Sequence, residues 1–90
     1  MGKIIKPAAA GTLESSDVFV TLDPDCEGLD IQIDSVVMKQ FGDEILAVTK
    51  DVLREFDVDN ARVSIVDRGA LECVLRARLE CAVLRAKGEC

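Results

Sequence analysis

The alternation of apolar and polar residues along the chain predicts three strands. Residues 18–22, VFVTL, are mostly β-branched or aromatic, a composition that favours a strand. In residues 29–34, LDIQID, apolar side chains alternate with acidic or amide ones, as in a strand that buries one face. The segment DPDCEG between them is rich in turn-forming residues, so we expect the two strands to pair as a hairpin. A third strand is expected at residues 61–67, ARVSIVD, and the pattern also allows a short strand around Ile4 and Ile5.

A first amphipathic helix is predicted after the second strand. Its apolar residues recur at steps of three or four and form one stripe, made of Val37, Phe41, Ile45, Val48, Val52 and Phe56. Ser35 is a candidate for the N-cap of this helix. A glycine inside a helix costs about 1 kcal/mol of stability. Because Gly42 would lie inside a helix capped by Ser35, the alternative is that the helix starts at Asp43.

A second helix is predicted over residues 70–87. Its apolar face consists of Leu71, Leu75, Leu79, Ala82 and Ala86. On the polar side, Glu72, Arg76 and Glu80 have the spacing of an i,i+4 ion-pair ladder. We interpret the arginines of this helix, Arg78 and Arg85 included, as a solvated surface with internal ion pairs rather than a basic binding face.

These elements predict an α+β fold. A strand, a helix and a returning strand imply a parallel crossover, and two amphipathic helices can cover one sheet face. We therefore expect a small two-layer sandwich in the order β-β-α-β-α, with the helices packed on one face of a mixed three- or four-stranded sheet. The length of 90 residues suits a single domain over residues 1–90, with a flexible N-terminal segment over about residues 1–16.

The charge of the chain excludes some classes of partner. A net charge of −6, and only three aromatic residues, argue against nucleic-acid binding, which needs clustered cations or stacking platforms. An acidic domain is better suited to docking on basic patches of partner proteins. The N-terminal residues MGKIIKPAAAG lack the apolar run of a secretory signal, and no segment has the roughly 18 apolar residues of a membrane span. We expect a cytoplasmic protein without membrane contact.

The residue types argue against an enzyme that works alone. The chain has no histidine and no evident lysine partner that could activate a serine nucleophile. Its cysteines, Cys26, Cys73, Cys81 and Cys90, contain no C-x-x-C pair, so no metal site is expected. In a reducing compartment these cysteines are expected to be small hydrophobic residues or free thiols, and the sequence assigns them no role.

The segment AGTLESSD, residues 10–17, places two adjacent serines directly before the first predicted strand. Serines in this position are usually turn residues. A serine without a base is also a suitable substrate, if another enzyme supplies the base. Local sequence therefore leaves both interpretations open for Ser15 and Ser16.

Three segments in the same order resemble one family. AGTLESSDVFVTL resembles the modification-site region of the citrate lyase acyl carrier proteins, the gamma subunits of that enzyme. DIQIDSVVMKQFGDEI is similar to the middle of those proteins, and DRGALECVLRARLE to their C-terminal region. The resemblance extends from about Pro7 to Arg85.

The resemblance implies a carrier subunit and not a catalyst. A serine of the family is linked by a phosphodiester to a phosphoribosyl-dephospho-CoA arm, whose thiol carries an acetyl or citryl thioester during citrate cleavage. The register of GTLES places this modification on Ser15, with Ser16 as the less favoured alternative, because glycine is also familiar at that position. The implied partners are the alpha (acyl transferase) and beta (acyl lyase) subunits of citrate lyase and a prosthetic-group transferase.

Two other functions remain open at this level. Carriers of related complexes, such as citramalate lyase or malonate decarboxylase, resemble this chain in arm chemistry. A small assembly module without a covalent arm would also fit the acidic surface and the aliphatic core.

Overall fold

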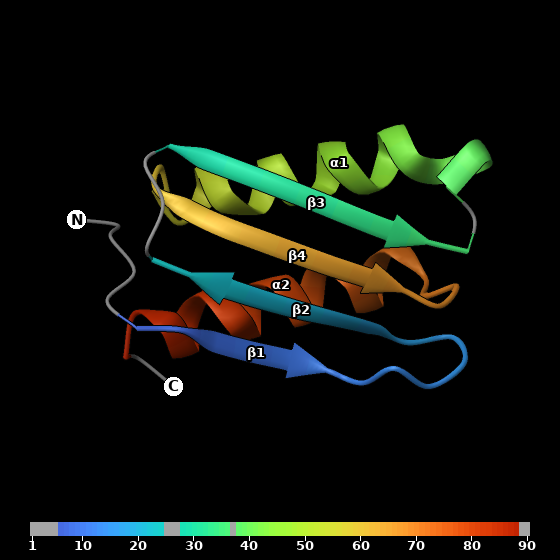
Figure 1. Ribbon diagram of the computed structural model, residues 1–90, viewed down its shortest axis with the longest axis horizontal. Coiled ribbons are helices and arrows are strands. Elements are labelled where there is room, and N and C mark those ends of the chain that lie inside the picture. The colour runs from blue at the N-terminus through green and yellow to red at the C-terminus, as the bar shows by residue number, and fades with distance from the viewer. Residues whose placement is uncertain (1–5, 25–27, 37, 89–90) are drawn as a thin grey trace.

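In a computed structural model of the chain, which describes residues 6–24, 28–36 and 38–88, four strands form one mixed sheet in the order β1-β2-β4-β3 (Figure 1). The strands are β1 (Ala8–Gly11), β2 (Val18–Asp23), β3 (Leu29–Ser35) and β4 (Ala61–Asp67). β2 is antiparallel to both β1 and β4, whereas β3 is parallel to β4. The parallel crossover predicted from the strand–helix–strand order is therefore present between β3 and β4.

Two helices cover one face of this sheet. α1 (Met38–Glu55) packs beside β3, α2 (Glu72–Ala86) packs against β1 and β2, and the helices contact each other (Figure 1). The predicted α+β sandwich and its order β-β-α-β-α are confirmed. In addition, β1 precedes this order at the edge of the sheet.

The core is aliphatic and lies between the sheet and the helices. Val20 is opposite Ile65 in the β2–β4 pair, and both side chains are fully buried. The helices contribute Leu53 and Leu79, which are also fully buried. Because full burial of such a side chain stabilises the fold by about 1.5–3 kcal/mol, this layer is the main source of stability.

The predicted hairpin between β2 and β3 is wrong, because β4 lies between them. Val63 and Ile65 of β4 have no exposed surface, and a central strand is covered by a neighbour on each side. β3 carries Asp30 and Asp34 and lies at the sheet edge, where charged residues oppose pairing with another chain. The burial of β4 thus overrides the pairing of strands that are adjacent in sequence.

The N-terminal residues differ from the expectation in one respect. Ile4 and Ile5 lie outside the described residues, and the strand before the serines is Ala8–Gly11. This strand pairs with β2 over its full length, so part of the segment predicted to be flexible is held in the sheet.

The start of α1 was predicted incorrectly. The helix begins at Met38 and continues through Gly42, which is buried. Ser35 belongs to β3, and its hydroxyl donates a hydrogen bond to Asp67 and not to a helix terminus. Tertiary packing of the apolar face outweighs the unfavourable helix propensity of one glycine.

Most of the predicted apolar stripe of α1 faces the core. Ile45, Val48 and Val52 are buried, and Phe56 packs against them at the helix end. Phe41 is 48% exposed, and Val37 lies outside the described residues.

α2 buries the predicted face, except at its start. Leu75, Leu79, Ala82 and Ala86 are buried, whereas Leu71 precedes the helix and is 71% exposed. The predicted ladder is present only in part: Glu72 interacts electrostatically with Arg76, but the closest partners of Arg76 lie on the other helix. Its guanidinium lies 3.0 Å from the Asp51 carboxylate and 3.5 Å from that of Glu55, both on α1. The side-by-side packing of the helices offers Arg76 closer acids than its own helix does.

Candidate functional site

The serines lie in the turn between β1 and β2. Residues 12–17 form this connection, and both serine side chains are exposed. Val18 is paired with Asp67, so the turn lies at the end of the sheet where β4 ends (Figure 1). The loop that joins β4 to α2 begins at the same place.

One carboxylate holds this turn together. The Thr12 hydroxyl donates to Asp17 Oδ2 over 2.6 Å, and the Val18 N–H donates to Oδ1 over 2.7 Å. Arg78 of α2 donates through Nε and Nη2 to the two oxygens, at 3.2 and 3.1 Å. The Asp17 side chain is only 15% exposed. These bonds make it the link between the serine turn, β2 and α2.

The same contacts change the acidity of Asp17. Its pKa is lowered to about 2, chiefly by the hydrogen bond from the Thr12 hydroxyl and next by the Val18 N–H. The Arg78 guanidinium lowers it further, while partial burial acts in the opposite direction. Asp17 is therefore ionised at neutral pH and is suited to structural support rather than proton transfer.

Backbone hydrogen bonds attach the turn to the β4–α2 loop. The Ser16 N–H donates to the Arg68 carbonyl at 2.8 Å, and the Arg68 N–H donates to the Asp17 carbonyl at 2.9 Å. Ser16 has a φ of 63°, in the left-handed region that glycine adopts most readily. The backbone at Ser16 is thus held by a hydrogen bond, while neither the Ser15 nor the Ser16 hydroxyl has a hydrogen bond to another described residue.

Gly11 is required for the close approach of the turn to β2. Its φ is +96°, and a Cβ at this position would lie 1.8 Å from the Val18 carbonyl oxygen and 3.4 Å from Arg78 Cδ. A larger residue would clash with the Val18 backbone and push the turn away from β2, while its contact with the Arg78 side chain would be ordinary.

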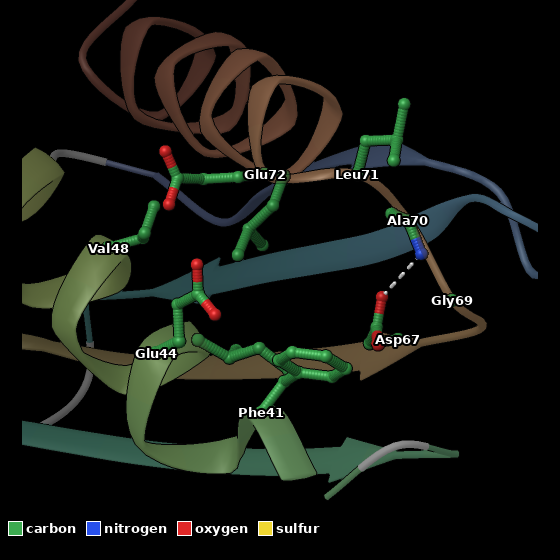
Figure 2. A pocket seen from close by; sticks show the side chains of 10 residues that line it. Phe41, Glu44, Val48, Asp67, Gly69, Ala70, Leu71 and Glu72 are labelled. Atoms are coloured by element: carbon green, nitrogen blue, oxygen red, sulfur yellow. Dashed lines mark hydrogen bonds between the residues drawn. The ribbon is translucent and has the colours of Figure 1, made fainter.

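A groove opens beside the turn, between the starts of the two helices (Figure 2). It has a volume of about 290 Å³, and Gly69 and Ala70 of the β4–α2 loop form part of its wall. Asp67 fixes that wall, because its buried carboxylate accepts hydrogen bonds from the Ala70 N–H at 3.0 Å and the Ser35 hydroxyl at 2.7 Å.

Sequence reasoning found the serines but missed the residues that hold them. Arg78 and Arg85 were assigned to a solvated surface, yet Arg78 binds Asp17 and Arg85 donates to the Ala9 carbonyl of β1 at 2.7 Å. The only signal for Thr12 and Asp17 was that such residues often form turns.

The cysteines take no part in this site. Cys73 is exposed and Cys81 is half-buried, both as free thiols, while Cys26 and Cys90 lie outside the described residues. Among the described residues, no group of His, Cys, Asp or Glu side chains could hold a metal ion. No helix in that part of the chain is long and apolar enough to cross a membrane.

Comparison with known proteins identifies the class to which this fold and turn belong. A model of an acyl carrier family, described as "Malonate decarboxylase delta subunit (MdcD)", matches residues 5–86. The chain therefore belongs to this acyl carrier protein family.

One relative shows which acyl carrier protein this chain resembles at high sequence identity. The chain is 53% identical over 87 residues to the citrate lyase acyl carrier protein of Haemophilus ducreyi, covering 97% of this chain and 90% of the relative. The resemblance to that carrier predicted from the sequence is confirmed.

Solved structures show the same fold. A chain in the crystal structure of a Pseudomonas malonate decarboxylase hetero-tetramer in complex with malonate matches with a TM-score of 0.77 and 25% identity, covering 94% of this chain and 86% of its own length. A Thermus thermophilus structure, with a TM-score of 0.59, 14% identity and coverage of 96% of this chain but 16% of the other, is similar in fold alone.

Replacing Gly11 by alanine should destabilise the protein more than the same change at Gly69. Gly69 has a φ of +89° and no atom within 4 Å of the point where a Cβ would lie, so Gly69→Ala should cost only the left-handed strain of about 1–2 kcal/mol. Gly11→Ala adds the clash with Val18, and its loss should be larger by about 1–3 kcal/mol. Urea denaturation measures both, and equal losses would contradict the close approach.

Replacing Asp17 by asparagine should destabilise the protein in a pH-dependent way. A carboxylate whose pKa falls on folding stabilises the native state above its unfolded pKa of 3.8, and this contribution disappears as the pH falls towards about 2. The stability difference between wild type and Asp17→Asn should therefore be constant at neutral pH and shrink between about pH 4 and about pH 2. Urea denaturation over this range tests it, with the exposed Asp43→Asn as control. A difference that stays constant down to the acid end would show that ionisation of Asp17 is irrelevant.

Proposed function

We propose that this chain is the acyl carrier subunit of a citrate lyase and that Ser15 carries its prosthetic arm. The observation that carries the proposal is the 53% identity, over nearly the whole chain, to a citrate lyase acyl carrier protein. The arm is a phosphoribosyl-dephospho-CoA group, joined to the serine by a phosphodiester. When bound, it supplies the thiol that carries acetyl or citryl as a thioester.

The residues of the turn fit such an attachment. Ser15 is exposed, and its hydroxyl is not used by the hydrogen bonds that close the turn. Asp17 and Arg78 keep the backbone beneath it fixed. The chain thus offers an accessible hydroxyl on a firm support, and the transferase would supply the base that this sequence lacks.

The geometry also favours Ser15 over Ser16. Ser16 has a φ of 63° and its N–H is bonded to Arg68. This conformation gives a physical reason why glycine is familiar at the position, since glycine meets it without strain. A site that accepts glycine has no need of the hydroxyl, which supports Ser15 as the attachment residue.

A carrier subunit acts together with other proteins. We propose as partners an acyl-transferring alpha subunit and an acyl-lyase beta subunit, with a transferase that loads the arm in the cytoplasm, as part of citrate fermentation. Tethering of the acyl group makes each transfer intramolecular, which raises its effective concentration. The chain itself contributes attachment and position and no catalytic group.

A second candidate is a carrier for malonate decarboxylase. Both the family description and the Pseudomonas structure carry that name, but the identity to the structure is 25% against 53% to the citrate lyase carrier. The higher identity favours citrate lyase.

Alanine at Ser15 should abolish the covalent adduct. The intact mass of the protein, produced together with the loading enzymes, should show the adduct in wild type and in Ser16→Ala and lack it in Ser15→Ala. Circular dichroism should be the same for all three, because both side chains are exposed. An adduct that persists in Ser15→Ala and maps to Ser16 would contradict the assignment.

The loaded protein should support cleavage of citrate and not decarboxylation of malonate. Purified citrate lyase alpha and beta subunits, mixed with the loaded chain and citrate, should release oxaloacetate, while malonate decarboxylase subunits with malonate should give at least about tenfold less product, a difference of about 1.4 kcal/mol. Loaded Ser16→Ala is the matched control and should behave as wild type. The reverse preference would establish the malonate decarboxylase alternative.

A further inference from the structure

We infer that the groove between α1 and α2 is a docking site for a partner protein that inserts a bulky apolar side chain flanked by lysine or arginine. The inference rests on the proposed function only for the identity of this partner. The groove itself belongs to the unmodified chain and does not depend on the arm.

The groove has an apolar floor and an exposed apolar mouth. Ile45, Val48 and Leu75 are 6%, 6% and 4% exposed and line its base. Phe41 and Leu71, which stand at the mouth, are 48% and 71% exposed. A volume of about 290 Å³ lies at the small end of the range for ligand pockets. Such a space suits a large side chain of a partner better than a long extended ligand.

Acidic side chains flank this apolar surface. Figure 2 shows Glu44 of α1 and Glu72 of α2 extending from facing helices beside Val48. Neither carboxylate lies within 4.0 Å of a basic nitrogen in the described part of the chain, although Glu72 interacts electrostatically with Arg76 one turn further on. Arg76 is also bonded to Asp51 and contacts Glu55, so three acids share this one cation, while Glu44 has no cation of its own among the described residues. The groove mouth thus keeps a negative charge that a basic residue of a partner would neutralise.

The groove is continuous with the serine turn. Ser16 is bonded to the Arg68 carbonyl, and the next residue, Gly69, lines the groove. Two more exposed apolar residues flank the same end of the sheet: Leu13, 57% exposed in the serine turn, and Val36, 62% exposed and bonded to the Asp67 carbonyl. Exposed apolar side chains gathered at one end of a sheet are consistent with an interaction site beside the groove. A partner that occupies the groove would therefore be held next to Ser15.

Charge selects a basic partner over other occupants. A second copy of this chain would also carry a net charge of −6, which opposes self-association at an acidic mouth. Phosphate or carboxylate groups would be repelled by Glu44 and Glu72 for the same reason. A basic protein surface with one protruding apolar side chain would complement both the apolar floor and the acidic mouth of the groove.

The experiment measures binding of the full-length chain, without its arm, to purified citrate lyase alpha and beta subunits by calorimetry. Leu71→Ser, which removes an exposed apolar contact, and the double variant Glu44→Lys with Glu72→Lys, which makes the groove mouth repel a basic partner, should each weaken binding to one subunit by at least about tenfold. Leu29→Ser removes an apolar residue that is 44% exposed at the start of β3, and Asp43→Lys reverses a neighbouring charge outside the groove. These controls should change the affinity by less than about threefold.

Each other result would overturn the inference. If groove variants and controls bind equally well, the groove is not the docking site, although the proposed function stands. If sedimentation shows that the groove variants alter self-association while partner binding is unchanged, the occupant is a second copy. If the unaltered chain binds neither subunit, the proposed function is wrong, and a citrate lyase subunit is not the partner of the groove.

Discussion

The presentation of Ser15 depends on the bidentate contact between Arg78 and Asp17. This contact joins residues 61 positions apart in the chain and fixes the turn between β1 and β2 against α2. Thr12 and the Val18 N–H complete the coordination of the same carboxylate. Because hydrogen bonds to a charged group are about twice as strong as neutral ones, one largely buried carboxylate can hold a short polar turn in a single conformation.

Asp67 has the corresponding role on the neighbouring strand. Its carboxylate accepts bonds from the end of β3, through Ser35, and from the loop before α2, through Ala70. The starts of both helices are thereby placed around one end of the sheet, where the groove opens. Asp17 and Asp67 are linked in turn, since Val18 pairs with Asp67 and Arg68 bonds to the Asp17 carbonyl. The serine turn and the groove are therefore connected by hydrogen bonds and are not two separate features.

A rigid mount agrees with the division of labour in a carrier. The absence of histidine is no defect if the transferase activates the serine and the reacting thiol belongs to the arm. In the proposed role, the chain would supply an attachment point for the arm and a surface that partner enzymes can recognise. The acidic and apolar surroundings of the turn, including Glu44, Glu72 and Leu71, provide the features from which such recognition is built.

The sequence by itself determined three of the four described strands, both helices and most of their buried faces, because a period of two or of three to four residues records which side of each strand or helix is apolar. It also indicated Ser15, through resemblance to a family and not through local chemistry. The tertiary structure decided what depends on neighbours distant in the chain. β4 lies between β2 and β3, where Val63 and Ile65 are fully buried, whereas β3, with its two aspartates, lies at the edge. Arg78 binds Asp17, and Arg76 binds Asp51 of α1, because folding places these carboxylates near the two guanidinium groups. The spacing of residues within α2 cannot reveal such partners. Periodicity describes one element at a time. The contacts that hold the serine turn, and the groove beside it, form only where several elements meet.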